Sequence, residues 1–260
     1  MTDRPGRIVS LVPSITELLF AIGVGDSLIG RTRFCEEPAG EVEPVEAVGG
    51  TKNPDCERII ALKPDLVVLN REENRIEDYD RLREAGLDLL VTHPRTVSGA
   101  VAMIEDTGAR VGGEDAAAAL AADCRAALEE CERSRSGRPP LRVFCPIWRR
   151  PWMTFGPNTY VADVLRSVGM TGALDESARD PVGVATHPDF FEVSLEDVVA
   201  AAPDLILLPD EPYAFGPEHI DELRAAGLVQ VRYERIDGRD LSWYGPRIPQ
   251  ALARLRRLCV

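Results

Sequence analysis

The chain has 260 residues, of which 45% are hydrophobic and 28% are charged, a composition typical of a folded globular protein. Its 43 acidic side chains outnumber its 30 lysines and arginines, so the net charge is −13 at pH 7. This excess of negative charge argues against partners such as nucleic acid or an anionic membrane surface. The length is compatible with one large domain or with two smaller domains.

The first half of the chain alternates between predicted strands and predicted helices, as expected for an α/β fold. Ser14 opens the capping-box sequence Ser-Ile-Thr-Glu, which predicts the start of the first helix. A polar loop rich in glycine and proline occupies residues 31–54, and a loop of this length is usually functional. We expect strands at residues 7–12, 27–32, 66–69 and 87–92, and helices at residues 14–22, 54–62, 76–85 and 97–111.

A long helix is predicted between the two halves of the chain. The sequence that starts at Glu114 is rich in alanine, leucine, glutamate and arginine, and it contains no glycine or proline before Gly137. About 20 residues of helix would span about 30 Å. We expect a stiff connecting helix over residues 114–133, with an ordinary surface helix inside one domain as the alternative.

The second half repeats the order of elements found in the first half. The segment "PDLVVLN" begins at Pro64 and "PDLILLP" begins at Pro203, 139 positions later, and a helix-compatible segment precedes each copy. Each copy predicts a helix, a Pro-Asp turn, a short buried strand and an acidic loop. Chance recurrence of αβ units is the alternative to a true repeat. We expect strands at residues 143–147, 205–208 and 229–236, and helices at residues 159–168, 195–201, 217–226 and 246–258.

This repeat predicts an α/β fold with two similar lobes, each built on a mainly parallel sheet and joined by one long rigid helix. The expected boundaries are 1–112 for the N-terminal lobe, 113–137 for the connecting helix and 138–260 for the C-terminal lobe. In an open parallel sheet, ligands bind at the carboxyl ends of the strands, beside helix N-termini. Pro13 and Ser14, at the start of the first helix, are therefore candidate binding residues.

Motifs for catalysis or for a bare metal ion do not stand out in the sequence. There is no Gly-x-Ser-x-Gly, no P-loop and no Gly-x-Gly-x-x-Gly after a strand, so we expect no catalytic residues and no enzyme. The three histidines, His93, His187 and His219, are far apart in the sequence. We expect structural roles for them, with a place beside a binding cleft as the alternative for His93 and His187, and no metal site.

Six cysteines are present, but no Cys-x-x-Cys pair that would suggest a zinc site. Cys124 and Cys131 lie in the predicted long helix and are expected to be small core residues. Cys35 and Cys56 could meet near the binding edge of the first lobe. Free thiols are the favoured state of this pair, and a disulfide is the alternative.

Aromatic residues are scarce, at 6% of the chain, yet they gather in loops next to predicted strands. Tryptophan and tyrosine in such loops suit a large, partly apolar ligand. The alternative is that these side chains pack into the core and contact no ligand. We weigh the two roles equally for Trp148 and favour a binding role for Trp152 and Trp243. The aromatic residues in these loops are Trp148, Trp152, Phe155, Tyr213, Phe215, Trp243 and Tyr244.

The most apolar N-terminal stretch, residues 8–24, is interrupted by polar residues and lacks a small-residue cleavage site. It is therefore predicted to be neither a signal peptide nor a membrane span. As written, the sequence predicts a cytoplasmic protein. A periplasmic or cell-surface location is expected instead if a leader was trimmed or the start codon was misassigned.

Four segments together resemble the helical-backbone solute-binding proteins of ABC importers, the class that includes the periplasmic vitamin B12-binding proteins. They are "RIVSLVPSITELLFAIGVGDSLIG", "VGGTKNPDCERIIALKPDLVVLN", "WMTFGPNTYVADVLRSVGM" and "SLEDVVAAAPDLILLPD". The first two are the more specific, and the resemblance covers nearly the whole chain. It implies two α/β lobes joined by one rigid helix, with a ligand held between the lobes.

The resemblance also implies a non-enzymatic function, a monomer and no intrinsic cofactor. The expected ligand is a metal chelate, with cobalamin or another corrinoid as the leading candidate and a ferric siderophore or haem as alternatives. A cytoplasmic metallocofactor-handling protein or enzyme with the same fold is the competing hypothesis. The candidate ligand-binding residues are Pro13, Ser14, Arg33, Phe34, Trp148, Trp152, Tyr213, Trp243 and Tyr244.

Proteins of this family present a carboxylate near the cleft mouth of each lobe, and these acids dock on arginines of the permease. The matching loops here carry Glu72 and Glu73 in the first lobe, and Asp210 and Glu211 in the second. Paired acids on pseudo-symmetric lobes would suit a two-fold symmetric basic partner. Solvated acids at strand ends, without a partner, are the alternative.

Overall fold

The computed structural model describes residues 4–135, 137–174 and 189–259 and divides the chain into two compact units. The first unit contains the chain up to Pro94, then Ser98–Arg125 and Trp243–Pro246. The second contains Arg95–Val97, Ala126–Ser242 and the residues from Arg247 onward. Two short segments therefore belong to the unit that the opposite half of the sequence forms.

The first unit is built on a four-stranded parallel sheet whose strands follow the order β2-β1-β5-β6. The strands of this unit are β1 (Ile8–Ser10), β2 (Leu28–Arg31), β5 (Leu66–Asn70) and β6 (Leu89–Thr92), with a small antiparallel pair of β3 (Gly49–Gly50) and β4 (Asn53–Pro54). Its helices are α1 (Pro13–Ala21), α2 (Cys56–Leu62), α3 (Ile76–Glu84), α4 (Val97–Val111) and the 3-10 turn η1 (Gly25–Ser27).

The second unit has its own four-stranded parallel sheet, in the order β12-β11-β7-β9. Its strands are β7 (Leu141–Phe144), β9 (Met170–Gly172), β11 (Leu205–Pro209) and β12 (Arg232–Ile236), with an antiparallel pair of β8 (Met153–Phe155) and β10 (Phe190–Glu192). Its helices are α6 (Tyr160–Val168), α7 (Leu195–Ala201), α8 (Pro217–Ala225), α9 (Arg239–Ser242), α10 (Ile248–Arg256) and the turn η3 (Arg257–Cys259).

The long helix α5 spans Glu114–Arg135, and it passes from the first unit to the second between Arg125 and Ala126. Its buried side chains include Cys124 and Cys131, which confirms the expectation that these cysteines are core residues. The predicted fold class, two similar α/β lobes with parallel sheets and one long helix, is confirmed. None of the helices in the described parts of the chain has both the length and the apolar character that crossing a membrane requires.

The two sheets have the same strand order when each half is read from its own start. Within each half, the first, second, third and fourth strands of the main sheet lie in the order 2-1-3-4. The two Pro-Asp segments found in the sequence begin β5 and β11, and both strands are buried along their whole length. The repeated sequence therefore marks the same central strand in each unit.

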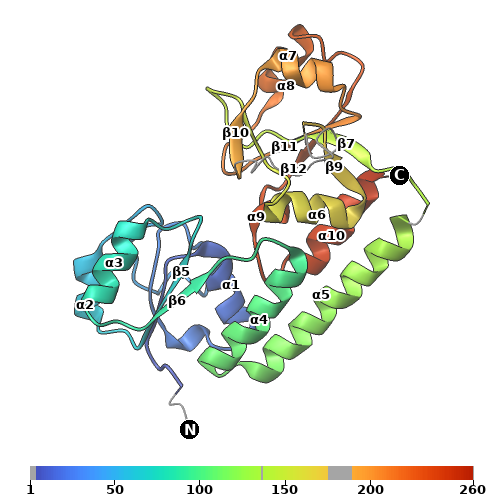
Figure 1. The fold of residues 1–260 in the computed structure, drawn as a ribbon. Helices are drawn as coiled ribbons and strands as arrows, with labels where there is room; N and C mark the ends of the chain where they lie inside the picture. Colours follow the sequence, from blue (N-terminus) through green and yellow to red (C-terminus); the bar gives the residue numbers. More distant parts are fainter. Residues whose placement is uncertain (1–3, 136, 175–188, 260) are drawn as a thin grey trace, which may run out of the picture. The chain divides into compact units, whose positions relative to one another are not determined.

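Helices cover both faces of each sheet. In the first unit, Val67 and Leu69 of β5 pack in one cluster with Ile59 of α2 and Leu82 of α3. Figure 1 shows α2 and α3 on one side of this sheet and α1 on the other. The alternate residues of β5 are buried as well, so the sheet packs on both faces, as is usual for parallel sheets.

The second unit is layered in the same way. Ile206 and Leu208 of β11 pack with Val198 of α7 and Leu223 of α8. In Figure 1, α7 and α8 lie on one side of this sheet, whereas α6 and α10 lie together on the other. The pair α7 and α8 thus corresponds to α2 and α3 of the first unit.

An aspartate at the start of each central strand aligns it with its neighbour. The Asp65 carboxylate accepts hydrogen bonds from the backbone N–H groups of Gly6, at 2.9 Å, and Arg7, at 3.0 Å. The Asp204 carboxylate accepts one from the N–H of Arg142, at 2.9 Å. Both aspartates also donate their own N–H to the carbonyl of the same arginine, Arg7 or Arg142, at 2.8 Å. The Pro-Asp pair therefore forms a turn and also fixes the register of the central strand against its neighbour.

The first helix begins differently from the prediction. Pro13 is the first residue of α1 and Val12 is its N-cap, with no side chain accepting from the helix N–H groups. Ser14 is therefore inside the first turn, so the capping-box interpretation was wrong. The physical reason is Pro13, whose fixed φ suits the first helical position and whose missing N–H needs no cap there.

Other element ends differ from the predictions by a few residues. The prediction for the first strand of the second half was residues 143–147, whereas β7 ends at Phe144 because the chain then turns through Pro146. The predicted strand at 229–236 begins at Arg232, and the closing helix begins at Ile248. The short elements η1, β3, β4, β8, β9, β10 and α9 were not predicted.

Glycine at two helix ends should stabilise the protein. Lys63 ends α2 and Ala202 ends α7, and both have left-handed backbone angles, with φ of 48° and 46°. A side chain at positive φ is strained, so Lys63→Gly and Ala202→Gly should each raise the free energy of unfolding by about 0.5–1 kcal/mol. Chemical denaturation measures this change. Ala226→Gly, at the end of α8 with φ −76°, is the control and should lower stability instead. Equal effects at all three positions would contradict the prediction.

Candidate functional site

The start of α1 in the first unit is buried. Pro13 and Ser14 are inaccessible, and the hydroxyl of Ser14 has no hydrogen-bond partner among the described residues. Thr16 donates to the carbonyl of Val12 at 3.0 Å, and its hydroxyl also lies 3.1 Å from the sulfur of Cys35. The start of α1 therefore contacts the loop that carries Cys35, and the side chains of Pro13 and Ser14 are not exposed in this structure.

Arg33 and Phe34 lie on the surface of the first unit, in the long polar loop after β2. The N–H of Arg33 donates to the carbonyl of Gly49 at 2.8 Å, and the guanidinium of Arg33 lies 5.0 Å from the centre of the Phe34 ring. Phe34 is 49% exposed. A β-carbon on Gly50 would come within 3.2 Å of both side chains, so they fold closely over the β3–β4 turn. An exposed cation–aromatic pair of this kind can contact a flat apolar ligand.

Two buried asparagines shape the loop after β5. The side-chain oxygen of Asn74 accepts from the N–H of Asn70 at 2.7 Å, and its amide donates to the carbonyls of Leu11 and Thr51 at 3.2 and 3.0 Å. The side-chain oxygen of Asn70 accepts from the N–H of Glu72 at 2.8 Å. These bonds fix the backbone of Glu72 at the carboxyl end of the sheet. Neither Asn70 nor Asn74 was among the predicted site residues, although both lie at the end of a predicted strand.

The Glu72 carboxylate makes contacts inside the first unit. One of its oxygens lies 3.3 Å from Nε2 of His93, and the other accepts from the hydroxyl of Tyr244 at 3.5 Å. Its backbone carbonyl accepts from Nζ of Lys52 at 2.6 Å. The Glu72 side chain is only 23% exposed. Its physical role here is to hold neighbouring side chains.

The segment Trp243–Pro246 packs within this same unit. Tyr244 is 3% exposed, and a β-carbon on Gly245 would lie 3.3 Å from the side chain of Leu18. Tyr244 was expected to face a ligand and is instead buried, because its hydroxyl reaches the Glu72 carboxylate. Trp243 remains half-buried beside it. The candidate surface of the first unit therefore consists of Arg33, Phe34 and Trp243.

A cluster of aromatic rings lies beside the carboxyl ends of β7 and β11 in the second unit. Trp148 is 45% exposed, and its ring meets the edge of Tyr213 with 5.5 Å between the ring centres. Tyr213 also contacts the buried Phe215, at 4.8 Å, and the buried His219, at 5.4 Å. Trp148 and Tyr213 are thus the accessible part of a cluster whose inner part belongs to the core.

Trp152 belongs to that inner part. It is 6% exposed, and its ring stacks on Phe215 with 5.7 Å between centres and 10° between planes. The guanidinium of Arg149 lies 4.9 Å from the Trp152 ring and forms an ion pair with Glu222. The Arg149 hydrogen bond lowers the pKa of Glu222. The expectation that Trp152 lines a binding surface was wrong, because the tryptophan fills the space between β11 and its covering helices.

The acids after β11 are held differently from Glu72. Asp210 is exposed, and its carboxylate accepts from the N–H of Gly238 at 2.8 Å. Glu211 is half-buried, and a β-carbon on Gly238 would lie 2.4 Å from its carbonyl oxygen. Only a glycine at position 238 allows the two loops to approach this closely. Glu73, on the first unit, is also half-buried.

The cysteines are free thiols in this structure. Cys35 lies 3.2 Å from the hydroxyl of Thr32, and burial raises the pKa of its thiol. Cys56 lies 3.8 Å from the carboxylate of Asp78. Cys35 and Cys56 do not form the disulfide considered as an alternative.

Across residues 4–135, 137–174 and 189–259, no group of three or more histidine, cysteine or acidic side chains could hold a metal ion. His187 lies outside the described residues.

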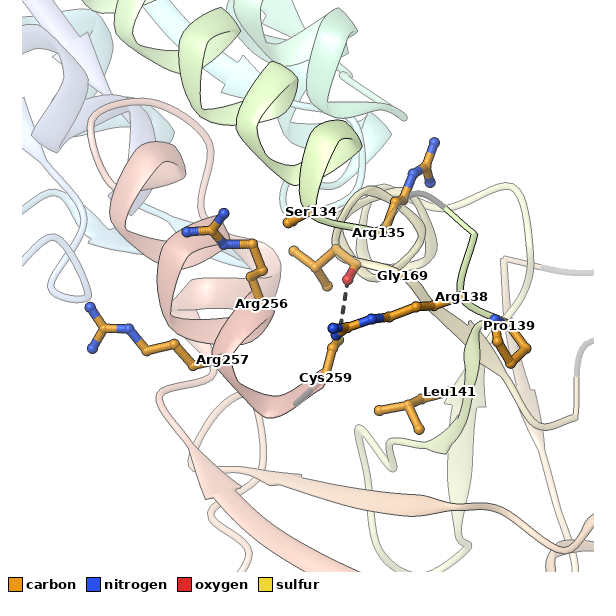
Figure 2. A pocket seen from close by; sticks show the side chains of 10 residues that line it. Ser134, Arg135, Arg138, Pro139, Leu141, Gly169, Arg256, Arg257 and Cys259 are labelled. Atoms are coloured by element: carbon orange, nitrogen blue, oxygen red, sulfur yellow. Dashed lines mark hydrogen bonds between the residues drawn. The ribbon is translucent and has the colours of Figure 1, made fainter.

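The second unit also contains a cavity of about 410 Å³ at the amino end of β7, which sequence analysis did not anticipate. Figure 2 shows four arginines around it, Arg135, Arg138, Arg256 and Arg257. Arg135 donates to the carbonyl of Arg166 at 2.8 Å, and Cys259 donates to the carbonyl of Val168 at 3.1 Å. These bonds satisfy the last turn of α6, so the cavity wall has a structural role.

Comparisons with known proteins give a consistent result along the whole chain. Residues 8–229 match a family model described as "Periplasmic binding protein". An uncharacterized ABC transporter substrate-binding lipoprotein of Bacillus subtilis is 30% identical over 97% of this chain and 79% of its own length. A vitamin B12-binding protein of Vibrio parahaemolyticus is 27% identical over 100% of this chain and 90% of its own length.

A solved structure agrees with these sequence matches. The periplasmic heme-binding protein RhuT from Roseiflexus, in its apo form, superposes with a TM-score of 0.80 at 26% identity. The superposition covers 96% of each chain.

Removing the Glu72 side chain should destabilise the first unit. Glu72→Ala deletes the acceptor for Tyr244 and the partner of His93, and we expect the free energy of unfolding to fall by about 1 kcal/mol. Urea denaturation followed by tryptophan fluorescence measures this loss. Glu36→Ala is the matched control, because Glu36 is an exposed loop residue. Equal stabilities of the two variants would show that the contacts of Glu72 contribute nothing.

Proposed function

The chain belongs to the periplasmic binding protein family, whose members serve ABC importers, and on this premise we propose that it binds a metal chelate for delivery to a permease. This membership confirms the resemblance inferred from the sequence. The observation that supports a chelate ligand best is the set of accessible aromatic rings at strand ends: Phe34 and Trp243 on the first unit, and Trp148 on the second. Each ring offers a flat apolar face to a large, flat ligand.

We propose a corrinoid such as cobalamin as the leading ligand. The relative from Vibrio parahaemolyticus is a vitamin B12-binding protein, and it matches the entire chain. Heme is the second candidate, because the similar Roseiflexus structure is a heme-binding protein. A ferric siderophore is the third. All three are large metal chelates that carry polar groups at their periphery, so exposed aromatic rings would suit each of them.

The ligand-contacting residues are proposed to be Arg33, Phe34, Trp148, Tyr213 and Trp243. Pro13, Ser14, Trp152 and Tyr244 are buried, and we propose that they support the loops that carry the contacting residues. The protein would act as a monomer, without catalysis and without a cofactor of its own. It would work in the periplasm or at the cell surface, where its permease can receive the ligand.

Absorption spectroscopy tests the ligand proposal. The purified protein is incubated separately with cyanocobalamin, hemin and a ferric siderophore and is then desalted, and we expect one of the three chromophores to stay with the protein. Trp148→Ala and Trp243→Ala should each weaken binding of that chelate about tenfold, because each removes about 1–2 kcal/mol of stacking and burial.

The control for these variants is Ile76→Ala, since Ile76 is an exposed apolar residue on α3, 65% accessible. Its affinity should equal that of the wild type. Loss of all three chromophores on desalting of the wild-type protein would contradict the proposed function. Unchanged affinity in one tryptophan variant would remove that residue from the proposed site.

Acidic side chains are proposed to dock on the permease. Glu73 and Glu211 are the pair to test, because they occupy corresponding loops, Glu73 after β5 in the first unit and Glu211 after β11 in the second. The double variant Glu73→Gln/Glu211→Gln should keep its ligand affinity but support slower uptake through the cognate permease in proteoliposomes. The loss should shrink at high salt, because charges at the rim of an interface act mainly on the association rate.

The matched control for docking is Glu36→Gln/Glu196→Gln, which removes one exposed acid from each unit, outside the loops after β5 and β11. Uptake with this control should equal the wild-type rate. Equal rates for both double variants at low salt would reject the docking role.

A further inference from the structure

Tyr213 is the accessible tyrosine of the aromatic cluster, and its hydroxyl is held by a buried histidine. The Tyr213 oxygen lies 3.2 Å from Nε2 of His219. His219 is 7% exposed and contacts both Tyr213 and Phe215, with its ring nearly perpendicular to each. The hydroxyl of a tyrosine can both donate and accept, so the direction of this bond depends on which nitrogen of His219 carries the proton.

A hydrogen bond from a backbone N–H group identifies which nitrogen of His219 carries the proton. The N–H of Gly216, at the start of α8, donates to Nδ1 of His219 at 2.9 Å. A backbone N–H can only donate, so Nδ1 must be the unprotonated nitrogen of a neutral imidazole. The proton is therefore on Nε2. The carboxylate of Glu218 lies 3.4 Å from the same Nδ1, but it is 71% exposed to water and farther away than the Gly216 nitrogen.

The direction of the His219–Tyr213 hydrogen bond follows from the Gly216–His219 hydrogen bond. Nε2–H of His219 donates to the Tyr213 oxygen, so the hydroxyl acts as an acceptor toward the histidine. The phenolic proton of Tyr213 is then directed away from His219. Among the described residues, none accepts this proton. Tyr213 is half-buried and its ring contacts the exposed Trp148, so this donor belongs to the accessible part of the cluster.

We infer that Tyr213 is a hydrogen-bond donor to the ligand, that its direction is set by the chain Gly216–His219–Tyr213, and that it selects chelates with peripheral amide or carboxylate oxygens. This inference rests on the proposed function. His219 is a positioning residue in this scheme, since it does not touch the ligand. The pairing of a flat aromatic surface with one directed donor would favour a chelate that has an oxygen acceptor at the rim of its ring system over an apolar ring of the same size.

The first test examines the histidine directly and needs no ligand. Two-dimensional ¹H–¹⁵N NMR of the imidazole nitrogens identifies the tautomer of each neutral histidine. We expect His219, assigned by its absence in His219→Gln, to be protonated at Nε2 in the ligand-free protein near pH 8. Protonation at Nδ1 would overturn the inference, whether or not any chelate binds.

The second test measures affinity for cyanocobalamin and hemin. Tyr213→Phe keeps the ring but deletes the donor, and it should weaken binding of the chelate that the wild type retains about three- to tenfold. The matched control is Tyr233→Phe, which deletes a hydroxyl that donates to the carbonyl of Leu228 at 2.7 Å. Its affinity should be unchanged. Equal affinities of Tyr213→Phe and the wild type would overturn the inference.

A double-mutant cycle separates positioning from a general structural effect of His219. His219→Gln should weaken binding when Tyr213 is present and should have little further effect in the Tyr213→Phe background. A loss of the same size in both backgrounds would contradict the positioning role. If the wild type binds none of cyanocobalamin, hemin and the ferric siderophore, the proposed function itself fails; normal wild-type binding with an unaffected Tyr213→Phe variant contradicts only this inference.

Discussion

The structure depends most on the alignment of each central strand by an aspartate at its start. Asp65 and Asp204 accept hydrogen bonds from backbone N–H groups of the neighbouring strand, and they donate their own N–H groups back to it. This reciprocal contact pairs Leu66 with Ile8 in one sheet and Leu205 with Val143 in the other. Since a shift of one residue would turn every side chain to the opposite face, the aspartates decide which residues pack against which helices.

The same alignment brings the loops that carry the candidate residues to one edge of each sheet. In parallel strands that start together, the carboxyl ends also lie together, and the loops after them become neighbours. The two units then use these ends differently. The first builds its loop from hydrogen bonds of the buried amides of Asn70 and Asn74, whereas the second builds its loop on stacked rings around Phe215. One repeated scaffold thus supports a polar loop in one unit and an aromatic loop in the other.

Burial divides the candidate residues into those that can touch a ligand and those that hold them. Phe34 and Trp148 keep about half of their surface accessible, while Trp152 and Tyr244 are almost fully covered. Glu72 belongs to the second group, although its position after β5 matched that of a docking acid. Its carboxylate lies between His93 and the hydroxyl of Tyr244, so it ties the segment Trp243–Pro246 to the first unit. A ligand site built in this way would owe its geometry to residues that the ligand never contacts.

The sequence by itself determined the alternation of strands and helices, the repeat of the Pro-Asp strand and the long helix, because these follow from local periodicity and from residues that act on their immediate neighbours. It also pointed to the loops that carry Arg33, Phe34 and Trp148. It could not separate Trp148 from Trp152, because the two share the same loop and similar flanking residues, and only packing against Phe215 buries one of them. The tertiary structure alone decided the roles of Glu72 and His219. Their partners, Tyr244 and Tyr213, become neighbours only when the strands align, and a hydrogen bond between distant residues leaves no periodic trace in a single sequence.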